Sequence, residues 1–214
     1  MAQVIAVTDA IKSLADVELR LNLRRNDQIT FFHEWRSPLP DLSPAETDDL
    51  AQLHRRLLYH RADGELLEGA VILLVVSPLL ELAGFYDPPF KIKAETTIEL
   101  TIDDGEEILR GHIDVLILQN RLWVAVLESK KTTISVRSAL PQALAYIMSR
   151  PKSDQPLFGI LTNGDDIVFV KLTQQPTPQY QLSRSFSLYT LPSELHLALQ
   201  TLKHLGQVAI GAVV

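Results

Sequence analysis

The sequence predicts an α/β fold with an α-β-β-β-α-β core and a mixed central sheet. Three observations support this fold class. The first part of the chain has apolar residues at helical spacing. Three strand-like runs separated by short turn sequences follow. A further helical segment then precedes more strands. Short turns join antiparallel strands, whereas a crossover helix joins parallel ones, so the sheet should be mixed.

The N-terminal segment is expected to start with a helix. Residues 9–22 carry apolar side chains at helical spacing, and Thr8 or Asp9 would be its N-cap. Residues 29–35 are consistent with a short strand, since they are rich in aromatic and β-branched side chains.

Two longer helices are predicted next. Ser-Pro-Ala-Glu at 43–46 is a capping box with proline at the first helical position, and the helix should run to Arg61. An apolar helix is expected over residues 65–84. Pro78 should kink or break it, because proline lacks the N–H that the helical hydrogen bond needs.

The middle of the chain predicts an antiparallel meander. Its three strands are expected at residues 91–102, 107–118 and 122–130, and they are joined by Asp103-Asp104-Gly105 and by Gln119-Asn120-Arg121. The remaining expected elements are a helix at 138–150 capped by Ser138, a hairpin at 156–172 around Asn163-Gly164, a strand at 179–190 and a helix from Pro192 that stops at Gly206.

Composition is that of an ordinary globular protein. The chain has 214 residues, of which 46% are hydrophobic and 21% charged, enough for one sizeable core. We therefore expect a single domain, divided into an N-terminal helical extension (1–64), a core (65–172) and a C-terminal strand and helix (173–214). No apolar run approaches the roughly 20 residues needed to span a bilayer, so no membrane association is expected.

Charge and cysteine content exclude some function classes. The absence of cysteine excludes disulfides, thiolate metal sites and a cysteine nucleophile, and it fits a cytoplasmic location. The net charge of -6 argues against a surface that attracts nucleic acid everywhere, although a local basic patch is compatible with it.

Residues with potential chemistry are concentrated in the predicted meander. Asp114 lies inside an apolar run, where a carboxylate is costly unless it is paired or coordinated, and Glu128 and Lys130 end the next run. The period of two places Glu128 and Lys130 on one strand face, and the intervening turn folds that strand back beside Asp114. Two carboxylates and an ammonium group should therefore converge.

Such a set suits phosphodiester hydrolysis with Mg²⁺. Asp114 and Glu128 would be ligands, and the backbone carbonyl of Ser129 could be a third. Lys130 would orient or activate the attacking water and stabilise the negative charge that develops on the phosphoryl oxygens. A structural salt bridge between Asp114 and Lys130 is the main alternative.

A helix with two further candidates follows. Gln142 and Tyr146 are four residues apart, so they share a helix face from which they could approach a bound strand or Lys130. Taken singly, both residues are also typical of an ordinary helix surface.

The ordered motifs GHID, ExK and QxxxY resemble the PD-(D/E)XK nuclease superfamily. The QALAY segment makes the chain similar to the subgroup that contains bacterial recombination nuclease domains and the N-terminal nuclease domain of type I restriction enzyme R subunits. This resemblance implies a restriction endonuclease-like fold, Mg²⁺ binding by Asp114 and Glu128, a catalytic role for Lys130, and accessory roles for Gln142 and Tyr146.

The subgroup also has an acidic residue on the helix before the strands. Glu68, binding metal directly or through water, is our choice, with Glu65 as the substitute; alternatively, Glu68 favours a helix N-terminus through the helix dipole. Ile113 stands where the superfamily name has proline.

The expected function is Mg²⁺-dependent hydrolysis of DNA by a stand-alone restriction or repair-type endonuclease domain, with Mn²⁺ as a substitute. The sequence contains no helicase motif, so it is not expected to be a complete motor subunit. A catalytically inactive DNA-binding or complex-assembly module of the same fold is the alternative. A homodimer and association with restriction or repair complex subunits are further expectations, since cutting two strands favours two sites.

Overall fold

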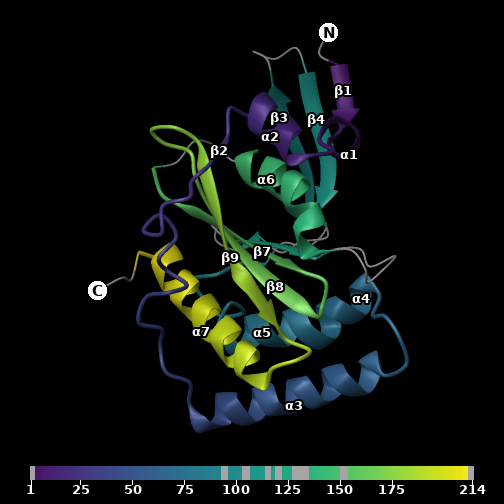
Figure 1. Cartoon of the computed structure of the whole chain (residues 1–214), viewed down its shortest axis with the longest axis vertical. Helices are drawn as coiled ribbons and strands as arrows, with labels where there is room; N and C mark the ends of the chain where they lie inside the picture. Colours follow the sequence, from purple (N-terminus) through teal and green to yellow (C-terminus); the bar gives the residue numbers. More distant parts are fainter. Residues whose placement is uncertain are drawn as a thin grey trace.

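The computed structural model shows two sheets joined through a shared helical layer (Figure 1). It describes residues 3–92, 96–102, 107–113, 117–118, 122–126, 135–149 and 154–211. In Figure 1 the smaller sheet lies with α1, α2 and α6 at the N-terminal end of the molecule, and α3 lies at the opposite end. The mixed α/β class predicted from the sequence is confirmed.

The smaller sheet has the strand order β1-β4-β3, and the larger has the order β2-β9-β8-β7-β6-β5. In the larger sheet β6 and β7 are parallel, whereas β7, β8 and β9 are antiparallel. The strands are β1 (Gln3–Ala6), β2 (Arg24–Arg25), β3 (Thr96–Ile102), β4 (Glu107–Ile113), β5 (Ile117–Leu118), β6 (Leu122–Val126), β7 (Leu157–Thr162), β8 (Asp166–Thr173) and β9 (Gln179–Ser187).

Helices cover both faces of the larger sheet. The helical elements of the described residues are α1 (Val7–Ala10), α2 (Leu14–Arg20), α3 (Pro44–Arg61), α4 (Glu68–Val71), the π-helical segment η1 (Ile72–Val76), α5 (Ser77–Leu82), the 3-10 turn η3 (Val136–Ala139), α6 (Leu140–Met148) and α7 (Pro192–Ala209). The helix α6 connects β6 to β7, and this crossover makes the two strands parallel.

Strand register assigns these helices to the two faces. Ile160 pairs with Phe169 and Ile167 with Phe186, so these side chains share the face that is covered by α5 and α7. Tyr180 lies on the opposite face, where its hydroxyl donates to Glu18 Oε1 of α2 at 2.8 Å. Because α2 packs against α6, these two helices form the second layer.

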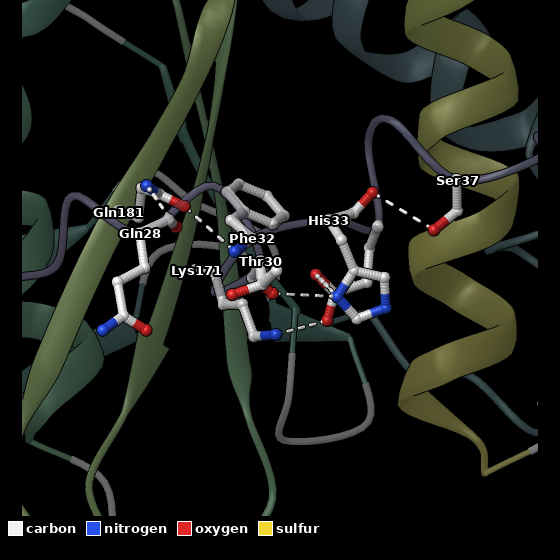
Figure 2. Close-up of polar contacts among 8 residues, drawn as sticks. Gln28, Thr30, Phe32, His33, Ser37, Lys171 and Gln181 are labelled. Carbon is white, nitrogen blue, oxygen red and sulfur yellow. Dashed lines mark hydrogen bonds and ion pairs between the residues drawn. The ribbon is translucent and has the colours of Figure 1, made fainter.

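A segment before α3 also covers the α7 face. Phe32 and Trp35 pack on Phe158 and Phe186, with ring centroids 6.1 and 6.2 Å apart. Next to them, Lys171 Nζ of β8 donates to Glu34 Oε1 at 2.5 Å, and both residues are buried. Figure 2 shows Lys171 near the ring of His33, and His33 Nδ1 lies 3.7 Å from Glu34 Oε2.

The predicted strand at 29–35 is wrong. These residues form successive turns, held to β9 by the hydrogen bond from Phe32 N to Gln181 Oε1 at 2.9 Å (Figure 2). Their aromatic side chains pack on the sheet face rather than continuing the sheet, so apolar content alone misassigned them.

The predicted single helix at 9–22 is also wrong, because the chain breaks between α1 and α2. Ser13 rather than Thr8 or Asp9 caps the main helix: its Oγ accepts from Asp16 N at 3.2 Å, and Asp16 Oδ2 accepts from Ser13 N at 2.8 Å. This internal capping box starts a new helix within the periodic apolar pattern.

The expected helix from Ser43 to Arg61 is confirmed, including its capping box. The next helix starts at Glu68 rather than at residue 65, and it does not break at Pro78. Instead, a π-helical segment precedes the proline, with Ser77 N donating to Ile72 O. The i→i+5 bonding just before Pro78 is the local distortion that the proline was expected to cause.

The meander is divided between the two sheets. Both predicted antiparallel pairings exist, because β3 pairs with β4 and β5 pairs with β6. However, the expected strand at 107–118 is represented by β4 in one sheet and β5 in the other. The three strands therefore do not form one continuous meander among the described residues.

Two helix boundaries differ from those predicted. Ser135, not Ser138, caps the turn that leads into α6, because its Oγ accepts from Arg137 N. Gly206 lies inside α7 rather than ending it: a Cβ there would come within 2.9 Å of the Phe85 ring. Close packing on Phe85 explains this glycine.

Candidate functional site

The candidate motif residues follow two described strands directly. The strand β4 ends at Ile113, immediately before Asp114, and β6 ends at Val126, two residues before Glu128. Asp114, Glu128, Ser129 and Lys130 themselves lie outside the described residues, so their roles stay predictions.

The end of β6 lies beside the end of β7. Val126 pairs in parallel with Thr162, the last residue of β7, and the Asn163–Gly164 turn follows. Parallel strands end at the same edge of a sheet. The strand that leads to Glu128 therefore reaches the edge at which the β7–β8 turn is built.

Local hydrogen bonds fix the shape of this turn. Asn163 Oδ1 accepts from the backbone N–H groups of Asp165 and Asp166 at 3.1 and 2.9 Å. Thr162 Oγ1 accepts from Gly164 N at 3.0 Å and donates to Asp166 O at 2.8 Å. An asparagine that bonds its own following backbone is a common basis for tight turns.

The turn packs directly against α4. Gly164 has φ +90°, and a Cβ at this position would lie 2.9 Å from Val71 Cγ2. Val71 is buried and ends α4, and Glu68 starts the same helical turn three residues earlier. This close approach brings the N-terminus of α4 to the sheet edge where β6 and β7 end.

An ion pair ties the preceding linker to the same turn. Arg61, the last residue of α3, donates from Nε and Nη2 to the two carboxylate oxygens of Asp165 at 2.8 and 2.6 Å. Its Nη1 also donates to Gly64 O at 2.7 Å. The hydrogen bonds to Asp165 raise the pKa of the Arg61 guanidinium, so the clamp stays charged.

The two acidic candidates before the strands differ in position. Glu68 is half-buried in the first turn of α4, whereas Glu65 is exposed in the linker before it. Glu68 is thus the better placed of the two for a site at this sheet edge. Its helix N-terminal position also fits the dipole explanation, so its metal role stays a prediction.

The accessory candidates lie on α6. Gln142 is half-buried, and Tyr146 is buried with 9% of its surface exposed. The helix contacts β7, α2 and β3, so it lies between the two sheets. Gln142 and Tyr146 lie four residues apart on this helix, as predicted, and their approach to a substrate or to Lys130 stays a prediction.

The carboxylate and carbonyl donors at Asp114, Glu128, Ser129 and Glu68 match the oxygen ligands that Mg²⁺ prefers. Within the described ranges, no three acidic or histidine side chains are grouped so that they could hold a metal ion. Those ranges contain Glu68 but not the other three predicted donors.

Sequence reasoning missed the Arg61–Asp165 clamp. Two adjacent aspartates such as Asp165 and Asp166 are typical of a solvated surface, and Arg61 ends a stretch of basic residues that starts at His54. The signal that could have suggested the pair was the placement of each charge at an element end, next to a turn.

The fold and the position of these elements define an α/β domain built on a mixed sheet. The comparison with known families is more specific: a model described as the type I restriction enzyme R protein N terminus matches residues 41–177, more than half of the chain. The chain belongs to this family. The matched range contains α3, Glu68, both strands that precede the motif, and α6.

Searches of curated proteins and of solved structures each found no match to the chain. None of the helices in the described part of the chain is long and apolar enough to cross a membrane.

Proposed function

We propose that this domain hydrolyses phosphodiester bonds in DNA in a Mg²⁺-dependent reaction, as an endonuclease domain of the restriction or repair type. The family match over residues 41–177 is the observation that carries the proposal, because the matched range spans all candidate positions from Glu68 to Tyr146. The convergence of the ends of β6 and β7 with the start of α4 supports it.

Asp114 and Glu128 are proposed to hold the cation, together with the Ser129 carbonyl and, directly or through water, Glu68. Bound Mg²⁺ would neutralise charge on the phosphoryl oxygens and lower the pKa of a coordinated water. Mn²⁺ should substitute, since it also accepts oxygen ligands.

The other motif residues act on the reactants. Lys130 is proposed to orient the attacking water and to stabilise the additional negative charge of the transition state through its ammonium group. Gln142 and Tyr146 are proposed to position the bound strand or the lysine from the α6 face.

The proposal is tested by incubating the purified chain with linear, circular and single-stranded DNA in Mg²⁺ or Mn²⁺. We expect cleavage that is lost in Asp114→Ala and in Lys130→Ala. Asp48→Ala and Lys91→Ala are matched controls, because both side chains are exposed and lie outside the motif. Cleavage that is unaffected by both motif variants would overturn the assignment.

A catalytically inactive module of the same fold, which binds DNA or assembles with restriction or repair subunits in the cytoplasm, is the second candidate. The net charge of -6, which weakens the attraction of the surface as a whole to DNA, motivates this candidate. Calorimetric titration with Mg²⁺ separates the two candidates, because an interaction module does not need a cation that depends on Asp114.

A further inference from the structure

A groove of about 330 Å³ lies between α3 and the helix formed by η1 and α5. Its floor is apolar: Leu53 is buried, and Leu74 and Leu82 are half-buried. Leu73 stands at its rim with 72% of its surface exposed. The π-helical segment that presents Leu73 and Leu74 is a feature often found at functional sites.

The two ends of the groove carry opposite charge. The helix α3 and the helix that follows it run in opposite directions (Figure 1), so Arg56 lies toward the Leu73 end and Asp49 toward the Glu81 end. All three charged side chains are exposed. Within the described residues none of them has an ion-pair partner, unlike Glu46 on the same helix, which pairs with Lys203 of α7.

This distribution is self-complementary. Asp49 and Arg56 are seven residues apart, about two helical turns or ~10 Å along the axis, and so lie on nearly the same face of α3. If two copies pack α3 against α3 in opposite directions, the acidic end of each groove meets Arg56 of the other copy. Gln52, midway between the charges, then lies near the two-fold axis.

We propose that this groove binds a second copy of the chain in a two-fold symmetric dimer. A two-fold interface uses the same patch on both copies, so it requires a surface that complements itself, as this one does. Leu73 of each copy supplies the exposed apolar side chain that contacts the groove of the other. Exposed ion pairs stabilise weakly, so the apolar contact holds the dimer and the charges set its orientation.

This surface does not depend on the proposed nuclease activity. The groove residues lie on α3, η1 and α5, whereas the candidate motif residues lie on or follow α4, β4, β6 and α6. A chain without DNA cleavage would retain the groove, and a monomeric chain could still cleave DNA. Failure of one proposal is therefore distinguishable from failure of the other.

Paired charge variants test the dimer by sedimentation velocity over a range of chain concentrations. Arg56→Asp makes both ends of the groove acidic, and Asp49→Arg combined with Glu81→Lys makes both basic. Each variant alone is expected to be monomeric, and an equimolar mixture of the two should form a heterodimer. Leu73→Asp should be monomeric, and Arg55→Asp, an exposed control on α3 outside the groove, should dimerise like the unaltered chain.

Circular dichroism of each variant checks that the fold is kept. A monomeric unaltered chain at all concentrations would overturn the proposal. Dimers of both charge variants, or a mixture of the two that stays monomeric, would overturn it as well, because the charge pattern would then not define the interface.

Discussion

Arg61 and Asp165 form a two-bond ion pair that joins the end of α3 to the turn between β7 and β8. The two residues are separated by 104 positions in the sequence. Through it, the linker that leads to Glu68 is fixed at the sheet edge where β6 ends. The candidate site is thus supported by a contact outside the candidate motif.

Removing this clamp should destabilise the domain. Arg61→Ala leaves Asp165 without its charged donor and frees Gly64 O, so we expect the free energy of unfolding to fall by about 1–3 kcal/mol. The side chains of Arg61 and Asp165 are 17% and 22% exposed, so we expect a loss near the lower end of this range. Urea denaturation measures it. Arg55→Ala is the exposed control, and an equal loss in both variants would contradict the role of the clamp.

Gly164 should not tolerate a side chain. Gly164→Ala combines the strain of φ +90° with a 2.9 Å approach to Val71, so a loss of about 1–3 kcal/mol is expected. Gly84→Ala has a similar φ of +81° but open space around its Cβ, so it reports strain alone and should cost less. If the contact with Val71 causes part of the loss, the double variant Gly164→Ala/Val71→Ala should be destabilised by less than the sum of the two single variants. Thermal unfolding of the three variants measures this difference.

The buried pair of Lys171 and Glu34 predicts a strong asymmetry between single and double changes. Lys171→Met leaves the Glu34 carboxylate buried without its donor, which should cost about 3–5 kcal/mol. Adding Glu34→Gln removes the unpaired charge and should restore part of the stability. Arg25→Met, which breaks the exposed Arg25–Asp27 pair, should change stability by less than about 1 kcal/mol. Equal effects of Lys171→Met and Arg25→Met would be inconsistent with burial of the pair.

Two aspartates should contribute to pH dependence with opposite signs. Burial raises the pKa of Asp166, so its contribution is most favourable below the unfolded pKa of about 4 and is lost as pH rises through the higher folded value. Hydrogen bonding with the Ser13 side chain lowers the pKa of Asp16. The contribution of Asp16 to stability is therefore present above its unfolded pKa and is lost as pH falls through its folded pKa.

Melting temperatures measured from about pH 3 to pH 7 test these signs. Relative to Asp166→Asn, the unaltered chain should lose stability as pH rises, whereas relative to Asp16→Asn it should gain stability. The same direction in both comparisons would contradict the assignment.

Local signals in the sequence predicted some elements well. The Ser43–Glu46 capping box defines the start of α3, and Asn163-Gly164 defines the turn between β7 and β8. In both cases the residues that determine the structure are adjacent in the chain. The helix that carries Gln142 and Tyr146 was predicted for the same reason, since Pro141 lies in its first turn.

Tertiary contacts account for the features that were not predicted. A glycine such as Gly206 often ends a helix, but here it permits close contact with Phe85, which is 121 positions earlier in the chain. Phe32 and Trp35 pack on strands that follow more than 100 residues later. The partition of the β4–β5 region between two sheets likewise depends on pairing with β1 and with β6. Such long-range partners cannot be read from a local pattern.

The most direct test of the central claim separates metal binding from turnover. Lys130→Met should bind Mg²⁺ with an affinity close to that of the unaltered chain, because the proposed ligands of the cation are Asp114 and Glu128, but it should not cleave DNA. Lys91→Met, an exposed lysine outside the motif, should cleave normally. Cleavage by Lys130→Met at the rate of the unaltered chain would contradict the proposed catalytic role of this lysine.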